Sequence, residues 1–247
     1  MARAPAARPR LSHPRGARTR ALQTVELLAA EYPDAETELA HRDPFELLVA
    51  TILSAQTTDE RVNLVTPALF ARYPDAPSLA RAPLDDVEDI IRTTGFFRSK
   101  SRAIVEMSQD LVERHGGAVP ARMEDLVQLR GVGRKTANVV LGVAFGVPGL
   151  AVDTHVTRLT NLLHLTRSAD PERIETEVTA LVPPAEWTDL GLRLILHGRR
   201  VCIARRPLCE RCVLAAFCPS AGLAAAERVR AGAARPARTS RPARRST

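Results

Sequence analysis

Apolar residues recur every three or four positions through most of the segment from residue 21 to residue 220, which is the period of an α-helix. Asp43-Pro44-Phe45-Glu46 combines an N-cap residue, a proline suited to the first helical turn and a capping-box acid. Gly95 and the pair Gly116-Gly117 are natural helix ends. No alternation typical of a strand continues beyond about four positions, so the pattern predicts an all-α protein of short helices. Besides helices opening near Asp43 and at Ser99, helices are expected over 123–129, 134–145, 152–164, 171–181 and 186–198.

A glycine-rich turn separates two of these helical segments: Leu129-Arg130-Gly131-Val132-Gly133-Arg134-Lys135-Thr136. Its glycines allow a tight turn that exposes N–H groups at the start of the next helix, and such a helix N-terminus attracts phosphate. The turn is not a nucleotide-binding P-loop, because Arg134 stands where a P-loop has the glycine directly before its lysine. From these eight residues alone, a phosphate-binding hairpin and a simple interhelical turn are equally good interpretations.

Charge divides the chain into segments of different character. Residues 1–20 hold six arginines and no acid, and residues 221–247 hold seven arginines and one glutamate, so both are expected to be disordered tails. Residues 21–129 contain ten basic and nineteen acidic side chains, whereas residues 130–220 contain twelve and eight. An ordered positive surface is therefore expected after residue 130, and such a surface suits a polyanion.

Lysine is rare in this chain: among 35 basic residues, Lys100 and Lys135 are the lysines and the rest are arginine. An ammonium can lose its proton, whereas a guanidinium effectively cannot. A lysine is therefore required wherever a neutral amine is needed. We expect Lys100 to be replaceable by arginine.

The four cysteines lie close together in the sequence, at Cys202, Cys209, Cys212 and Cys218. A disulfide framework would spread them along the chain, so they predict one local metal site in a reducing compartment. Four thiolates suit either tetrahedral zinc or a four-iron, four-sulfur cluster, and the spacing does not decide between them. Six arginines surround the cysteines and are expected to form a basic patch that suits a polyanion: Arg193, Arg199, Arg200, Arg205, Arg206 and Arg211.

Neither a membrane span nor a secretory signal is expected. No stretch approaches the roughly 18 apolar residues of a span, and the N-terminus lacks the apolar core of a signal peptide. The arginine-rich, acid-free N-terminus has the composition of a mitochondrial transit peptide. Its prolines interrupt any amphipathic helix, which favours a biased tail instead.

Several motifs in combination resemble the endonuclease III family, the bifunctional DNA glycosylases and abasic-site lyases of the helix-hairpin-helix superfamily. They are Leu129–Val140 (LRGVGRKTANVV), Ala151–Val156 (AVDTHV), the Cys-x6-Cys-x2-Cys-x5-Cys run, Leu53–Asp59 (LSAQTTD) and Ile195–Arg199 (ILHGR). The resemblance covers roughly residues 21–220 and leaves both tails outside.

The resemblance implies a two-domain fold with a DNA-binding cleft between the domains. A six-helix barrel domain with the helix-hairpin-helix would span residues 37–148. A domain holding a 4Fe-4S cluster on the four cysteines would combine residues 21–36 with 149–220, leaving the tails 1–20 and 221–247. The expected partner is double-stranded DNA with a damaged base or an abasic site. We expect a monomer that acts in the cytoplasm at a bacterial-type nucleoid, without a membrane.

The implied chemistry requires an amine that attacks the sugar carbon bearing the base and forms a Schiff base, which arginine cannot do. We therefore expect Lys135 to be the nucleophile. The helix N-terminus, the neighbouring Arg134 and burial would favour its neutral form. Asp153 would stabilise positive character on the sugar and move protons. At the start of a helix, its ionised form is favoured; it could also simply cap that helix.

Further DNA contacts follow from the resemblance: Gln56, Phe96, Arg130, Gly131, Val132, Gly133, Arg134, Thr154 and His155. Gln56 would fill the space left by the extruded base, and Phe96 would wedge into the duplex beside it. The chain departs from the family at two of these positions. Arg130 replaces a proline and adds a phosphate-seeking charge, and Phe96 replaces a leucine.

Two other functions compete with this one. An adenine-specific mismatch glycosylase shares the cluster and the aspartate, but generally lacks the hairpin lysine and carries an extra C-terminal domain. Lys135 is present here, and 29 residues follow Cys218, which disfavours that relative. A non-catalytic DNA-binding module stabilised by a bound metal would bind DNA in a salt-dependent way and form no covalent intermediate.

Overall fold

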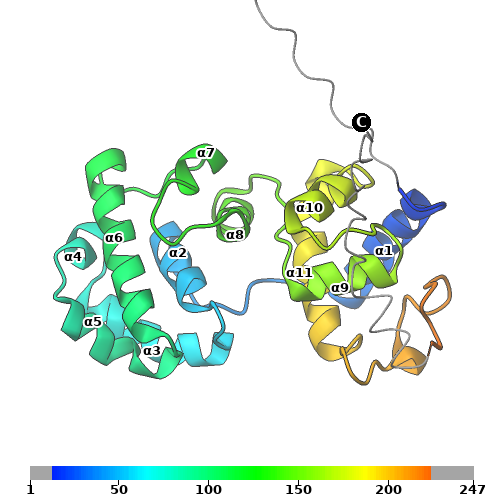
Figure 1. The fold of residues 1–247 in the computed structure, drawn as a ribbon, viewed down its shortest axis with the longest axis horizontal. Helices are drawn as coiled ribbons and strands as arrows, with labels where there is room; N and C mark the ends of the chain where they lie inside the picture. The colour runs from blue at the N-terminus through cyan, green and yellow to red at the C-terminus, as the bar shows by residue number, and fades with distance from the viewer. Residues whose placement is uncertain (1–12, 224–247) are drawn as a thin grey trace, which may run out of the picture. The chain divides into compact units, whose positions relative to one another are not determined.

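The computed structural model describes residues 13–223, and within them it contains helices, turns and loops and no strand (Figure 1). The all-α prediction is confirmed. These residues form two compact units. The smaller unit combines residues 13–31, 152–183 and 194–223, and the larger one combines residues 32–151 and 184–193.

Seven α-helices of the larger unit precede the interruption by the smaller one. They are α2 (Pro44–Leu53), α3 (Asp59–Arg72), α4 (Ala76–Ala80), α5 (Leu84–Ile91), α6 (Phe97–His115), α7 (Met123–Leu126) and α8 (Arg134–Phe145). Two 3-10 helices, η1 (Arg92–Thr94) and η2 (Pro184–Glu186), also belong to this unit. Helix α2 is buried along nearly its whole length and contacts α3, α6 and α8, so it forms the centre of the core. Figure 1 shows α6 as the long helix of this unit.

The start of α2 follows the predicted capping pattern with one difference. The Asp43 carboxylate accepts a hydrogen bond from the Glu46 backbone N–H at 2.9 Å, and Pro44 occupies the first helical position. In a capping box the Glu46 carboxylate would accept from the Asp43 N–H. Here it accepts from the backbone N–H of Arg42 at 2.8 Å and from the Arg42 guanidinium, so this buried acid is fully engaged.

The segment 184–193 belongs to the larger unit although its neighbours in sequence belong to the smaller one. Helix α11 (Trp187–Arg200) therefore contributes its first half to one unit and its second half to the other. Close contacts explain this division: the Thr188 side chain fills the space beside Gly142, and a Cβ on Gly191 would lie 3.3 Å from Leu150. The predicted boundaries at residues 37 and 148 differ from the observed 32 and 151 by a few residues.

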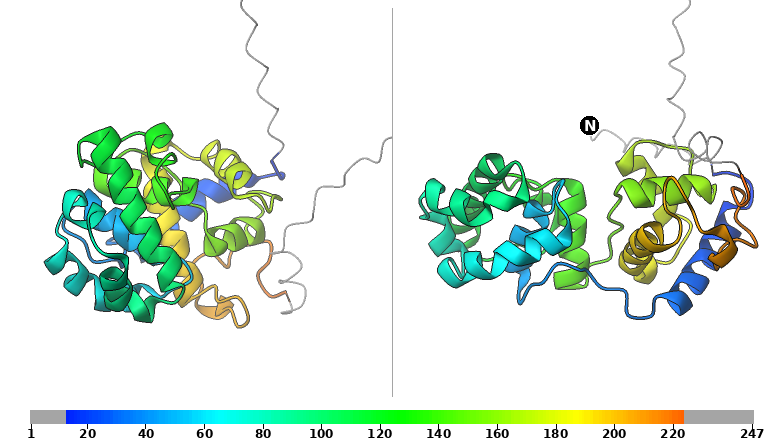
Figure 2. Two further views of the ribbon diagram at one scale, coloured as in Figure 1. Left: turned by 60° about the vertical axis from the view of Figure 1, so that its left-hand side comes forward. Right: turned by 90° about the horizontal axis from the view of Figure 1, so that it is seen from below.

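The smaller unit contains α1 (Ala17–Glu31), α9 (Thr154–Leu162), α10 (Pro171–Thr179), the end of α11 and the 3-10 helix η3 (Cys209–Arg211). The first of these, α1, is drawn in blue in Figure 2. The prediction of a disordered tail up to residue 20 is wrong for residues 17–20, which form the first turn of α1. Ala17 and Ala21 are buried, and Arg20 donates to the Leu163 and His164 carbonyls at 2.7 and 2.8 Å. Predictions for residues 1–12 and 224–247 lie outside the described residues.

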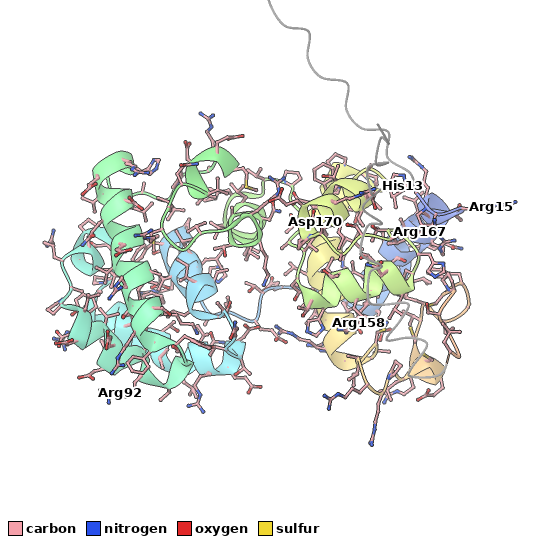
Figure 3. The ribbon with its side chains drawn as sticks, in the orientation of Figure 1. His13, Arg15, Arg92, Arg158, Arg167 and Asp170 are labelled. Atoms are coloured by element: carbon pink, nitrogen blue, oxygen red, sulfur yellow. The ribbon has the colours of Figure 1, made fainter. Side chains whose placement is uncertain are left out.

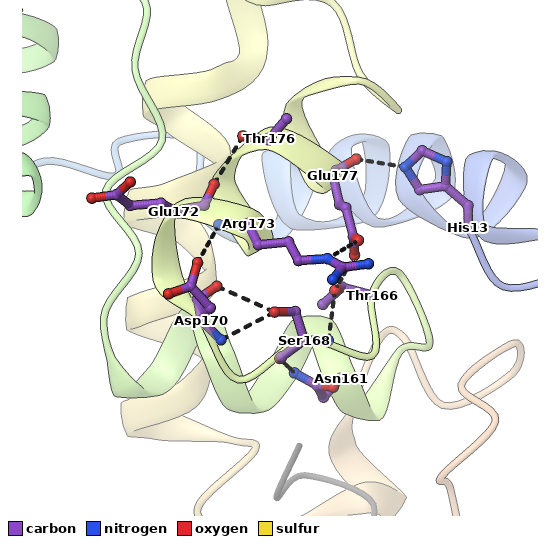
Figure 4. Close-up of polar contacts among 9 residues, drawn as sticks. All are labelled: His13, Asn161, Thr166, Ser168, Asp170, Glu172, Arg173, Thr176 and Glu177. Atoms are coloured by element: carbon purple, nitrogen blue, oxygen red, sulfur yellow. Dashed lines mark hydrogen bonds and ion pairs between the residues drawn. The ribbon is translucent and has the colours of Figure 1, made fainter. Parts of the chain in front are cut away.

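A buried carboxylate organises the loop before α10 (Figure 4). Glu177 accepts hydrogen bonds from the Thr166 hydroxyl at 2.5 Å and from the Arg173 guanidinium at 2.8 Å. The His13 ring lies 2.8 Å from the Glu177 backbone carbonyl. These contacts join α10 and the loop at 164–170 directly before it to the segment preceding α1, which is distant in sequence.

Across residues 13–223, no helix combines the length and the apolar character needed to cross a membrane.

Candidate functional site

The predicted hairpin lies between α7 and α8, and Gly131 and Gly133 have different structural roles in it. Gly131 has φ +76°, and a Cβ there would lie 3.1 Å from the Ala103 side chain, so this position requires glycine. Val132 is buried and anchors the turn in the core. Gly133 is the N-cap of α8 and makes no side-chain cap hydrogen bond, and it is exposed together with Arg134 and Lys135. The hairpin therefore has the form of a phosphate-binding helix N-terminus.

Lys135 is the second residue of α8, and its side chain is exposed. The sequence interpretation relied partly on burial to favour the neutral amine, and that burial is absent in the chain by itself. The position at the helix N-terminus is as expected. Lys135 thus lies in the first turn of α8, directly after the glycine turn, with its side chain exposed.

Arg130 has partners within the protein. Its Nε donates to the Glu106 carboxylate at 2.6 Å, and its backbone N–H donates to Asp110 at 3.1 Å. Hydrogen bonding to Glu106 raises the pKa of Arg130 above its ordinary value. Its charge is thus already paired with α6, and the expected gain of a phosphate-seeking charge is reduced.

Asp153 is the N-cap of α9 in the smaller unit. Its carboxylate accepts from the Val156 N–H at 2.8 Å, and its side chain is half-buried. Thr154 beside it is exposed and His155 is half-buried, and burial lowers the pKa of His155. Capping leaves one carboxylate oxygen for another partner. Lys135 belongs to the larger unit, whereas Asp153 belongs to the smaller one.

Arg158, labelled in Figure 3, links α9 to the cysteine-bearing loop. Its guanidinium donates to the Gly198 carbonyl at 3.1 Å and to the Cys202 carbonyl at 2.8 Å, and it lies 3.3 Å from the His155 ring. A Cβ on Gly198 would lie 2.7 Å from His155, so glycine is required for this close approach. Helix α9, which Asp153 caps, is therefore connected through Arg158 to the backbone of the first cysteine.

Gln56 and Phe96 share an unusual backbone conformation. Their φ angles are +54° and +48°, in the left-handed region that non-glycine residues seldom adopt. Both side chains are exposed, and Phe96 has 68% of its surface exposed. Phe97 instead packs against the core, which leaves Phe96 as the projecting aromatic residue of this turn.

Lys100 is a residue that the sequence interpretation missed. The expectation that arginine could replace it is not supported, because its side chain is buried and its ammonium donates to three oxygens on the segments that flank Gln56 and Phe96. The rarity of lysine in an arginine-rich chain was the available signal.

The four cysteines line one small cavity in the smaller unit. Burial raises the pKa of the Cys202 thiol to about 11 and also raises that of Cys212. The His197 ring lies 3.3 Å from the Cys212 sulfur, and the Cys202 N–H donates to the His197 carbonyl. Among the described residues, no three His, Cys, Asp or Glu side chains converge tightly enough to bind one metal ion. An iron–sulfur cluster does not need this, because each iron of a four-iron cluster takes a single thiolate.

The arginines near the cysteines are mostly placed as expected. Arg193 is the exception: it is buried, bonds to Asp189 at 3.1 Å and belongs to the larger unit. The other members of the expected patch are exposed: Arg199, Arg200, Arg205, Arg206 and Arg211.

Comparison with protein-family models gives two matches. Residues 49–184 match the HhH-GPD superfamily of base excision DNA repair proteins. Residues 202–218 match the iron-sulfur binding domain of endonuclease III. The second match favours the iron–sulfur cluster over zinc, the choice that the cysteine spacing left open.

Relatives and solved structures agree with these matches. Endonuclease III of Synechocystis is 52% identical over 203 residues, which cover 82% of this chain and 93% of the relative. Endonuclease III of Escherichia coli K12 is 40% identical over 197 residues, covering 80% and 93%. A solved structure of a trapped endonuclease III–DNA covalent intermediate matches with a TM-score of 0.79 at 40% identity, covering 86% of this chain and 98% of that one. This chain is thus a helix-hairpin-helix base excision DNA repair protein, and it belongs to the endonuclease III family.

Proposed function

We propose that this chain removes oxidised pyrimidines from duplex DNA and then cleaves the resulting abasic site by β-elimination. One observation supports the proposal most strongly. Lys135 lies in the first turn of α8, directly after the glycine turn, in a chain that belongs to this family. A related endonuclease III has been trapped as a covalent intermediate with DNA, which supports a nucleophilic mechanism here. The protein acts as a monomer on DNA in the cytoplasm of a bacterial-type cell.

Lys135 performs the covalent chemistry. Its neutral Nζ attacks C1′ of the damaged nucleotide, and the bond from C1′ to the base breaks, so that the base leaves with the bonding electrons and a proton. With one proton of the nitrogen gone to the departing base, the C1′–O4′ bond breaks, O4′ leaves with the bonding electrons and takes up a proton, and a protonated Schiff base results. The protonated imine acidifies the C2′ proton; removal of that proton expels the 3′ phosphate oxygen and cuts the strand. Hydrolysis of the imine then returns Lys135 as an amine.

Asp153 supports this sequence as a carboxylate near the reacting sugar. It stabilises the positive character that develops when the base leaves, and it accepts or returns protons. Its bond to the Val156 N–H fixes its position, so capping and catalysis are compatible roles.

The extruded base leaves a space in the duplex that the protein must fill. Gln56 and Phe96 are exposed and project from adjoining turns, which suits a residue that probes the vacated space and a wedge that separates a base step. The hairpin residues Gly131, Gly133 and Arg134 bind the phosphate backbone through main-chain N–H groups, Val132 anchors the turn, and Thr154 and His155 add contacts from α9.

Cys202, Cys209, Cys212 and Cys218 hold the 4Fe-4S cluster. When bound, the cluster supplies a cross-link that fixes the 202–218 segment, and the exposed arginines of that segment meet DNA phosphates. Anaerobically purified protein should be brown and absorb near 400 nm. Cys202→Ser should lose this colour, whereas colourless protein containing one zinc ion would contradict the assignment.

Reductive trapping distinguishes an enzyme that forms a covalent intermediate from a module that only binds DNA. Borohydride reduction during incubation with thymine-glycol or abasic duplex should yield a covalent protein–DNA adduct. Lys135→Ala should form none while retaining salt-dependent DNA binding. No adduct with the wild-type protein, or an undiminished adduct with Lys135→Ala, would overturn the proposal.

A further inference from the structure

The ammonium of Lys100 is buried in the larger unit, with 5% of the residue exposed. It donates to the Leu53 carbonyl at 2.8 Å, the Thr57 hydroxyl at 2.6 Å and the Thr94 carbonyl at 2.8 Å. An ammonium carries three N–H donors and no acceptor, so each donor has one oxygen. The Thr57 hydroxyl in turn donates to the Thr94 carbonyl, which closes a small network.

The three acceptors lie within or directly before two surface turns, the 54–58 loop and the 95–96 turn. Leu53 ends α2 and precedes the 54–58 loop, which contains Gln56 and Thr57. Thr94 ends η1 and precedes the 95–96 turn, which contains Phe96. One ammonium on α6 therefore fastens both turns to the core, and the hydrogen bond from the Thr57 hydroxyl to the Thr94 carbonyl joins the two turns directly.

Both turns contain a residue in an unfavourable conformation. Gln56 and Phe96 have positive φ, which persists only where the surroundings determine it. Their own side chains are exposed, so packing of those side chains does not hold the backbone in place. Main-chain contacts must do so instead: the Phe96 carbonyl accepts from the Lys100 N–H at 3.1 Å, and the Lys100 side chain fixes the segments on either side.

We propose that Lys100 is a positioning residue that holds Gln56 and Phe96 in the geometry with which they enter the DNA duplex. It acts through the 54–58 loop and the 95–96 turn and never touches the reacting atoms. The effect on DNA rests on the proposed function. The hydrogen bonds by which Lys100 holds the two turns do not depend on that function.

The chemistry of the site explains why a lysine is present in a chain whose other basic residues, apart from Lys135, are arginine. The donors of an ammonium diverge in three directions and can reach three oxygens on different segments. A guanidinium is larger and planar, and its donors lie in a single fork. Arginine at this position would need the turns to move apart.

Hydrogen exchange tests the fastening without any DNA. In Lys100→Met, amides of the 54–58 loop and of residues 94–97 should exchange at least about tenfold faster, while amides of α8 keep their protection. Ser108→Ala is the matched control. It removes a buried hydroxyl from the same helix that bonds to Ile104, within α6, and not to either turn. Unchanged exchange in both turns of Lys100→Met would overturn the proposal.

Two DNA substrates test the functional consequence. Single-turnover excision of thymine glycol from duplex should fall at least about tenfold in Lys100→Met, because the inserted residues are misplaced. Borohydride trapping on a single-stranded abasic oligonucleotide, where no base stack is opened, should change less than about twofold. Equal losses on both substrates would indicate a general structural role and overturn the proposal.

A double-mutant cycle tests whether Lys100 affects excision through Phe96. Phe96→Ala should cost less in the Lys100→Met background than in the wild type, because Lys100 acts through Phe96. Additive losses would contradict the proposal. If Lys100→Met fails to fold, Thr57→Val serves in every assay, since it removes the hydroxyl that connects Lys100 to the Thr94 carbonyl and leaves the lysine in place. If the wild type forms no adduct at all, the proposed function fails. Hydrogen exchange still shows whether Lys100 holds the 54–58 loop and the 95–96 turn in place.

Discussion

Around Lys100 the larger unit surrounds an ammonium with fixed oxygen acceptors, whereas around Lys135 it leaves the side chain exposed at the start of α8. The first environment uses every donor of the ammonium. The second provides a positive helix end and no buried partner, so the amine stays available to an incoming electrophile. The same residue type thus serves as a structural donor in one region and, in the proposed mechanism, as the nucleophile in the other.

The comparison indicates that the two positions need a lysine for different properties. As the proposed nucleophile, Lys135 must be able to give up a proton, which no arginine can do. Lys100 must fit a compact space with three divergent acceptors, which a planar guanidinium cannot do. Replacing each lysine by arginine separates these properties, because the charge is kept at both positions.

The largest effect is expected for Lys135→Arg. Excision and borohydride-trapped adduct should fall by more than about 10³-fold, because the nucleophile is lost. The free energy of unfolding should stay within about 0.5 kcal/mol of the wild type, since the site is exposed. Adduct quantification and urea unfolding measure the two quantities. Adduct formation by Lys135→Arg would break the assignment of this lysine as the nucleophile.

Lys100→Arg should show the opposite pattern. We expect the free energy of unfolding to fall by about 2 kcal/mol, from overpacking and imperfectly paired carbonyls. Urea unfolding checks this value, with Lys135→Arg as the matched control for the same chemical change. Wild-type stability in Lys100→Arg would show that the site tolerates a guanidinium and would remove the contrast between the two regions.

Much of the local structure followed from the sequence because it depends on neighbouring residues. The cap at Asp43, the glycine turn at 131–133 and the N-cap at Asp153 are all set within four positions along the chain. The sequence also suggested the special status of Lys135, through the chemistry that a lysine permits.

Contacts between distant segments could not be predicted in the same way. Lys100 and Leu53 are 47 positions apart, and Arg130 and Glu106 are 24 apart. Their pairing depends on how α2, α6 and the hairpin pack, which periodicity does not specify. The helical start of α1 within the expected tail was missed for the same reason, since Arg20 bonds to carbonyls 143 and 144 positions away. Composition alone made that segment resemble a tail.

The smallest effect concerns the pH dependence of stability. Burial lowers the pKa of Lys100 below its ordinary value of 10.5. Between the lowered pKa and 10.5 the unfolded chain binds more protons than the folded chain, so the contribution of this group to stability increases as the pH rises. Urea unfolding at several pH values from about 8 to 10.5 should therefore show the wild type gaining stability relative to Lys100→Met. Lys135 and the tyrosines are common to both proteins and cancel in the difference. A difference that shrinks with rising pH would mean that the three acceptors stabilise the ammonium more than burial penalises it, and the folded pKa would then lie above 10.5. That result would keep Lys100 as a fastening group but make it a stronger one, because its three hydrogen bonds would then outweigh the cost of burying a charge.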